Sequence, residues 1–168
     1  MYKIYSNLFQ INLEELPYQN DNSLDLDKIL RFIQKKPSIF FLPNPNQPIE
    51  DTLNFEKLEF LANECLKNNC LFFIDEAYHH FGADSGIELI NKYENVVVAR
   101  TFSKIYGLAG MRVGYLIADP EMIEKISSFG LGDYSLNQAG VAAAIASYND
   151  EKFLKYSKEK IVEARDML

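Results

Sequence analysis

A lysine and an arginine stand in a glycine-containing segment directly after an apolar run. Val96–Ala99 is apolar, and it is followed by polar residues that include Thr101, Ser103 and Lys104; Arg112 lies further along, among three glycines. This pattern predicts a buried strand that delivers an amine and two hydroxyls into a turn. A lysine amine that loses its charge on desolvation can transfer protons, and the fork of an arginine matches phosphate oxygens. Lys104 and Arg112 are therefore candidates for chemistry.

Two other apolar runs also end in polar side chains. Ser38–Leu42 is followed by Asn44 in a proline-rich loop, and Leu71–Ile74 is followed by Asp75 and Tyr78. In an open parallel sheet the carboxyl ends of the strands share one edge, and ligands bind in the crevice there. We therefore expect an amide, a carboxylate, a phenol, hydroxyls and an amine to converge on one edge of a sheet.

The order of the predicted elements is that of an α/β domain. Apolar spacing predicts helices over Met1–Phe9, Ser23–Gln34, Asn54–Asn68, Gly86–Tyr93 and Asp119–Ser127. They are followed by an alanine-rich helix, which Ser135 and Gln138 cap and which ends near Tyr148, and by a last helix from Asp150. Strands are predicted over Gln10–Tyr18, 38–42, 71–74, 96–99 and Val113–Ala118. Continuous apolar strands between helices are typical of a parallel sheet that is covered on both faces. We expect a three-layer αβα domain with a mostly parallel sheet.

Composition excludes several classes of protein. A chain of 168 residues with 48% hydrophobic residues is long enough for one domain with a sizeable core. Its net charge of −7 and the lack of a basic run argue against nucleic-acid or anionic-membrane partners. No apolar run approaches the roughly 20 residues of a spanning helix, and no signal peptide is recognisable. Cys65 and Cys70 are too few for a disulfide framework, so we expect reduced thiols in a cytoplasmic protein.

Three motifs, in this order, resemble the fold-type I pyridoxal-phosphate (PLP) aminotransferases, and most closely their histidinol-phosphate aminotransferase branch. They are N-P-N-Q-P from Asn44, D-E-A-Y from Asp75, and T-F-S-K from Thr101 with G-L-A-G-M-R-V-G from Gly107. The resemblance implies the PLP-binding large domain, with residues 1–150 as its central part and residues 151–168 as a helix that leads toward a small C-terminal domain. The family's upstream glycine loop and its small domain have no counterpart here, so we expect an incomplete large domain.

The resemblance also implies which residues contact the cofactor ring. Lys104 would form the Schiff base with PLP and then move protons as a general acid and base. Asp75 would face the pyridine nitrogen and keep it protonated, because an opposite charge stabilises the cation. Tyr78 and Asn44 would hydrogen-bond to the phenolate oxygen of the ring. The implied catalytic residues are thus Lys104, Asp75 and Tyr78.

The cofactor phosphate and the substrates follow from the same resemblance. Arg112 would bind the phosphate with help from Thr101 and Ser103. The implied reaction moves an amino group between an amino acid, or an amino-phosphate such as histidinol phosphate, and a 2-oxo acid. The full-length form is expected to be a homodimer in which the neighbouring subunit completes each site, and the isolated piece is expected to be inactive.

Two alternatives stay open at this stage. Leu71–Ile74 followed by Asp75 and Glu76 is also typical of the Walker-B strand of a P-loop NTPase, although no Gly-Lys dipeptide is present to form the phosphate loop. The second alternative is a PLP-fold fragment that is catalytically incomplete. Strand alternation predicts that Glu76 points away from Asp75 and is structural. The His79–His80 pair has no second ligand cluster, so we predict no metal site.

Overall fold

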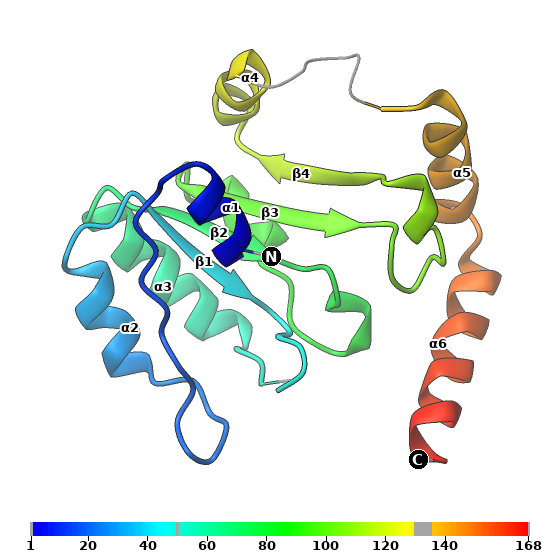
Figure 1. The fold of residues 1–168 in the computed structure, drawn as a ribbon, viewed down its shortest axis with the longest axis horizontal. Helices are drawn as coiled ribbons and strands as arrows, with labels where there is room; N and C mark the ends of the chain where they lie inside the picture. Colours follow the sequence, from blue (N-terminus) through cyan, green and yellow to red (C-terminus); the bar gives the residue numbers. More distant parts are fainter. Residues whose placement is uncertain (1, 50, 130–135, 168) are drawn as a thin grey trace.

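The computed structural model describes residues 2–49, 51–129 and 136–167. Its helices are α1 (Tyr2–Leu8), α2 (Leu26–Ile33), α3 (Phe55–Lys67), α4 (Pro120–Phe129), α5 (Gln138–Tyr148) and α6 (Glu151–Asp166), with short 3₁₀ turns η1 (His79–Phe81), η2 (Ile87–Asn91) and η3 (Ala109–Met111). Its strands are β1 (Ile39–Pro43), β2 (Leu71–Asp75), β3 (Val96–Thr101) and β4 (Gly114–Ala118). Figure 1 shows α2 and α3 at one side of the sheet and α5 and α6 at the other end of the molecule.

The strands form one mixed sheet in the order β1-β2-β3-β4. β1, β2 and β3 are parallel, and β4 runs antiparallel to β3. The predicted, mostly parallel sheet is therefore confirmed. Pro43 lies opposite Asp75, and Asp75 lies opposite Ala99, so the carboxyl ends of three strands meet at the same edge (Figure 1).

The core lies between the sheet and the helices α2 and α3. Leu58, Leu61 and Cys65 of α3 are fully buried, together with Phe72 and Ile74 of β2. These helical residues recur at three- and four-residue spacing, which places them on one face of α3. The amphipathic pattern of the sequence thus fixes which face of α3 packs against the sheet.

Helix α1 covers part of the opposite face. The ring of Tyr2 packs against Phe41 of β1 with 5.2 Å between ring centroids, and Phe41 alternates with the buried Phe40 along the strand. Because neighbouring strand residues point to opposite faces, α1 and α3 lie on different sides of the sheet. This arrangement gives the three layers that the sequence predicts.

Three local predictions need correction. Gln10–Tyr18 is mostly exposed and forms no strand, because none of its side chains is fully buried against the sheet or the helices. The helix predicted over Gly86–Tyr93 is the 3₁₀ turn η2, in which Leu89 N–H donates to Gly86 O. Asn137 caps α5 by accepting from Gly140 N–H, whereas Ser135 lies outside the described residues.

None of the helices in the described part of the chain combines the length and the apolar character that crossing a membrane requires.

Candidate functional site

The loops after β2 and β3 bring Tyr78 and Lys104 together. The Nζ atom of Lys104 lies 4.8 Å from the centre of the Tyr78 ring, which is within the range of a cation–π contact. Lys104 is exposed and Tyr78 is half-buried. Two of the predicted catalytic side chains, from different motifs, therefore meet at the predicted edge of the sheet.

Asp75 ends β2 at the same edge, and its carboxylate is held from two sides. Its Oδ1 atom accepts a hydrogen bond from Ala77 N–H at 3.1 Å, and its Oδ2 atom accepts one from the hydroxyl of Tyr2. The side chain is half-buried and alternates with Ile74, so it lies on the sheet face that carries α1. The sequence pattern gave no signal for the Tyr2 contact, because Tyr2 precedes Asp75 by a long stretch of chain.

The structure gives the Asn44 side chain different partners from the predicted ones. Asn44 is 0% exposed. Its Oδ1 atom accepts from Leu53 N–H at 2.9 Å, and its Nδ2 atom donates to the carbonyls of Asp84 at 3.0 Å and Leu53 at 3.3 Å. A hydrogen bond from Asn44 to a cofactor ring would require these bonds to break. The main chain of Asn44 does reach the site, since its N–H donates to the Asp75 carbonyl at 2.9 Å.

We expect Asn44→Ala to destabilise the fold. The substitution leaves the buried main-chain N–H and C=O of Leu53 without their partner, and an unsatisfied buried polar group costs about 1–3 kcal/mol. Urea denaturation of both proteins measures the change. Asn46→Ala, in the same loop but not fully buried, is the matched control. An equal loss of stability in both variants would contradict the role of Asn44 in holding the loop.

The hairpin between β3 and β4 places Thr101, Ser103 and Arg112 near one another. Thr101 lies opposite Gly114, and its Oγ1 atom accepts from Ser103 N–H at 3.0 Å. Arg112 is exposed and has a left-handed backbone with φ 55°, and its guanidinium donates to Ala109 O at 3.0 Å. Residues other than glycine adopt this conformation rarely, and such positions concentrate at binding sites.

A glycine is needed where the two strands of this hairpin approach most closely. A Cβ atom at Gly114 would lie 2.9 Å from the carbonyl oxygen of Arg100, a contact that would push β4 away from β3. The glycine therefore keeps the start of β4, and Arg112 before it, close to the end of β3.

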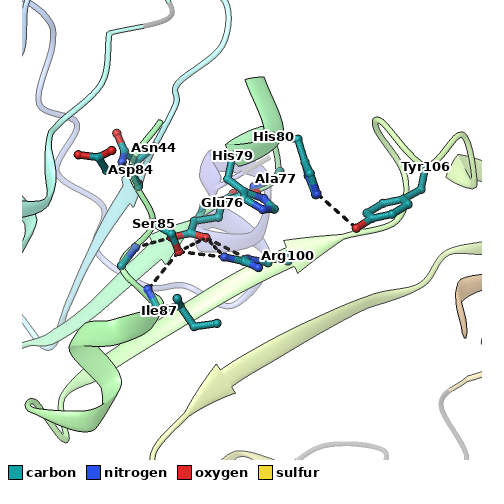
Figure 2. A network of polar contacts seen from close by, with 12 residues as sticks. Asn44, Glu76, Ala77, His79, His80, Asp84, Ser85, Ile87, Arg100 and Tyr106 are labelled. Atoms are coloured by element: carbon teal, nitrogen blue, oxygen red, sulfur yellow. Dashed lines mark hydrogen bonds and ion pairs between the residues drawn. The ribbon is translucent and has the colours of Figure 1, made fainter. Parts of the chain in front are cut away.

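Behind the site, Glu76 and Arg100 form a buried ion pair (Figure 2). The Glu76 side chain is 0% exposed and that of Arg100 is 16% exposed, with 2.8 Å between Nη2 and Oε2. Ser85 Oγ and Gly86 N–H also donate to the Glu76 carboxylate, at 2.9 Å and 2.6 Å. The prediction that Glu76 is structural is thus consistent with its contacts. A carboxylate engaged in this way does not have the Walker-B role of holding Mg²⁺ beside Asp75.

His79 and His80 follow Glu76 in the chain, and their rings contact each other at a tilt of 48° with 3.8 Å between ring centroids. His80 Nε2 lies 3.3 Å from the hydroxyl of Tyr106 (Figure 2). Burial, with the positive charge of Arg100 nearby, lowers the pKa of His79 to about 4. Burial, with His79 and Arg100, lowers the pKa of His80 to about 4 as well. Both rings are therefore neutral at pH 7.

This pair makes the stability of the fold depend on pH in acid. In the unfolded chain each histidine binds a proton near pH 6.5, whereas the folded chain resists protonation down to about pH 4. The unfolded state binds more protons in this window, so stability falls as the pH is lowered from 6.5 to 4. We expect His79→Gln/His80→Gln to flatten this part of the stability curve, measured by urea denaturation at several pH values. If stability falls with pH as steeply in the double variant as in the parent protein, the two histidines do not cause the loss of stability in acid.

No group of three or more His, Cys, Asp or Glu side chains within the described ranges is arranged to hold a metal ion. Cys65 and Cys70 are both buried and free.

An α/β sheet that gathers a lysine, a phenol, a carboxylate and an arginine at the carboxyl edge of its strands defines the class of protein: a ligand-binding α/β domain with a candidate catalytic lysine. The family model described as aminotransferase class I and II matches residues 1–168. The chain belongs to this family of class I and II aminotransferases.

Similar proteins agree with this assignment. The chain is 31% identical to a histidinol-phosphate aminotransferase of Clostridium acetobutylicum, over 98% of this chain and 46% of that protein. It is 37% identical to a histidinol-phosphate aminotransferase of Methanosphaera stadtmanae, over 88% of this chain and 39% of that protein. The crystal structure of histidinol-phosphate aminotransferase from Sinorhizobium meliloti in complex with pyridoxal-5'-phosphate has a TM-score of 0.89 and 30% identity, and the match covers 98% of this chain and 45% of that one. The chain therefore spans less than half the length of these relatives.

Proposed function

We propose that this chain forms the cofactor-binding part of a PLP-dependent aminotransferase, with Lys104 as its catalytic residue. The observation that carries the proposal is the contact of Lys104 with Tyr78 at the sheet edge where Asp75 also ends its strand. Membership of the class I and II aminotransferases and the similarity to a PLP-containing structure support it.

The side chains at this edge fit the chemical groups of PLP. The cofactor carries an aldehyde, a phenolate, a pyridine nitrogen and a phosphate. The described residues at the edge offer a complementary partner for each group, namely the Lys104 amine, the Tyr78 phenol, the Asp75 carboxylate, and the Arg112 guanidinium with the Thr101 and Ser103 hydroxyls. Asn44 is already bonded to backbone groups, so we assign it to the shape of its loop and not to the cofactor.

When bound, PLP supplies an aldehyde that condenses with amines and a ring that withdraws electrons from the substrate carbon. In the proposed mechanism, the Lys104 amine would hold the cofactor at its aldehyde and would take up and release a proton at Nζ. The contact with Tyr78 keeps this amine above the edge of the sheet. The Asp75 carboxylate would pair with the ring nitrogen and keep a proton there, since an opposite charge at contact stabilises the cation.

The substrates that we propose are an amino acid and a 2-oxo acid. The names of the two relatives favour histidinol phosphate as the amino compound.

We also propose that residues 1–150 are the central part of the large domain and that α6 leads toward a smaller one. The full-length form in this proposal is a homodimer, supported by the exposed apolar side chains Ile145, Tyr148 and Tyr156 on α5 and α6. Sedimentation of the full-length form, with a monomer contradicting the dimer, tests this last point.

Borohydride trapping tests the assignment of Lys104. The chain is mixed with PLP, reduced, digested and mapped by mass spectrometry, beside Lys104→Ala and the surface control Lys67→Ala. We expect the reduced adduct on Lys104, its loss in Lys104→Ala and its retention in Lys67→Ala. An adduct spread over surface lysines, or one that survives Lys104→Ala, would show that the proposed cofactor site is wrong.

A further inference from the structure

The two cysteines of the chain stand on either side of the end of helix α3. Cys65 lies in the last turn of α3, and Cys70 directly precedes β2. Cys65 is 0% exposed and Cys70 is 1% exposed, and both belong to the buried core between α3 and the sheet. Neither takes part in the proposed aminotransferase site, because Cys70 lies at the amino edge of the sheet and that site lies at the carboxyl edge.

The end of α3 forms a motif that brings the two side chains together. Cys70 N–H donates to Cys65 O at 2.9 Å, and Asn69 N–H donates to Leu66 O at 3.1 Å. Asn69 has a left-handed backbone with φ 53°. These two bonds and the left-handed residue define a Schellman motif, in which the side chains at the positions of Cys65 and Cys70 often make an apolar contact. In this chain both partners of that contact are thiols.

The main-chain bond between the cysteines limits how far apart they can lie. Standard covalent geometry and the N···O distance of 2.9 Å keep the two Cα atoms within about 6.8 Å of each other. Disulfides join Cα atoms that are roughly 4.4–6.8 Å apart. The side chains also meet, since the thiol of Cys65 forms a hydrogen bond with that of Cys70. A bond between the two sulfur atoms is therefore within reach without a change in the course of the main chain.

The hydrogen bonds make Cys70 the more acidic of the two thiols. Cys70 Sγ donates to Leu71 O at 3.5 Å, which leaves its sulfur free to accept from Cys65. The bond from Cys65 lowers the pKa of Cys70, because it stabilises the thiolate, and it raises the pKa of Cys65, whose proton it holds. The thiolate is the form that attacks an oxidant. Cys70 is therefore the sulfur that reacts first.

A cavity gives Cys70 a route to small molecules. Cys70 lines a cavity of about 330 Å³ at the amino edge of the sheet. Three carboxylates and one amine line the same cavity, those of Glu94, Asp119, Glu121 and Lys125. Carboxylates repel an anion such as glutathione disulfide, whereas hydrogen peroxide carries no charge. The cavity therefore favours a small hydroperoxide as the oxidant.

We propose that Cys65 and Cys70 form a reversible disulfide when the protein meets a hydroperoxide. The Cys70 thiolate attacks one peroxide oxygen, the O–O bond breaks and hydroxide leaves, so that Cys70 becomes a sulfenic acid. The Cys65 sulfur then attacks the Cys70 sulfur, and the S–S bond forms as the hydroxyl group leaves with the Cys65 proton as water. The proton that Cys70 lost converts the hydroxide into a second water. The two thiols are oxidised and hydrogen peroxide is reduced, independently of the aminotransferase reaction.

Peptide mapping without reduction tests the bond directly. The protein is treated with hydrogen peroxide, unfolded in the presence of a reagent that blocks free thiols, and digested with trypsin. Lys67 lies between the cysteines, so trypsin places them in separate peptides, 58–67 and 68–92. We expect these peptides to stay joined after peroxide treatment, with the loss of two hydrogen atoms, and to separate on reduction with dithiothreitol.

Two matched variants separate the roles of the thiols. In Cys65→Ala the sulfenic acid on Cys70 has no partner, so we expect dimedone, which reacts with sulfenic acids, to label Cys70. In Cys70→Ala we expect Cys65 to take up no more than about a tenth of that label, because a buried thiol that keeps its proton is a poor nucleophile. Urea denaturation of the reduced variants shows whether both keep the fold, and the mapping of the parent protein depends on neither.

Four results would overturn the inference in different ways. If both thiols stay free while methionines gain oxygen, peroxide does not reach Cys70. If Cys70 becomes a sulfinic acid and no joined peptides form, Cys65 does not reach its sulfur. If the disulfide joins two chains, the pair does not react within one chain. If Cys70→Ala is labelled as strongly as Cys65→Ala, Cys70 is not the sulfur that reacts first.

Discussion

Replacing Glu76 with alanine is expected to lower the free energy of unfolding by about 3–5 kcal/mol, because the substitution leaves a buried positive charge without its partner. Arg100, whose side chain is 16% exposed, then loses the hydrogen bond from its Nε atom and the ion-pair contact of its Nη2 atom, and Ser85 and Gly86 lose an acceptor. Urea denaturation of the two proteins at neutral pH measures the difference.

A surface ion pair provides the matched control for this experiment. Glu59 pairs with Lys92 at 2.9 Å, but both side chains are solvent-accessible. Exposed pairs contribute little, since water and salt screen them. We expect Glu59→Ala to leave the unfolding curve nearly unchanged. If Glu76→Ala and Glu59→Ala lose the same stability, the buried pair does not brace the ends of β2 and β3.

In the full-length form, Lys104→Ala is expected to slow the formation of 2-oxo acid from an amino acid by about 10²–10⁴-fold, the range that a positioned acid or base contributes. The reaction is followed as 2-oxo acid formed per mole of PLP-loaded full-length protein, so that a single turnover is enough to be counted. The fold of the variant should be unaffected, because Lys104 is exposed and its removal opens no cavity.

Added amines separate loss of the proton-transfer group from loss of the site. A small primary amine in the buffer can carry the proton that Lys104 moves, so we expect it to restore part of the rate in Lys104→Ala. The same amine should have no effect on Lys67→Ala, whose lysine lies on the surface of α3. An unchanged rate in Lys104→Ala would show that this lysine is not the catalytic base.

The fold could be predicted from the sequence because its elements are locally consistent. The runs Leu71–Ile74 and Val96–Ala99 are apolar at every position, and the structure buries their strands in one sheet. Polar residues that follow such strands must then lie at the shared edge, which is why Lys104 and Tyr78 meet as expected. The family assignment from the motifs is also confirmed.

The contacts that depend on tertiary packing could not be predicted in the same way. The resemblance to the family assigned Asn44 to the cofactor, but the partners of its side chain, Leu53 and Asp84, lie in loops whose course no local pattern reveals. The partner of Glu76 was hidden for the same reason, since Arg100 belongs to another strand. Tyr2 showed only helical spacing, which says nothing about a contact with Asp75.

Asp75 and Glu76 are neighbours in the chain, yet they face different surroundings: one meets Tyr2 and the other meets Arg100. A substitution at Asp75 therefore changes the proposed binding site, whereas a substitution at Glu76 changes the buried ion pair. Evolution can vary the two separately, although their codons are adjacent. A change of length is another matter, because one residue inserted into β2 would turn every following side chain to the other face. Asp75 and Glu76 would then exchange faces of the sheet, so this segment should accept substitutions far more readily than insertions or deletions.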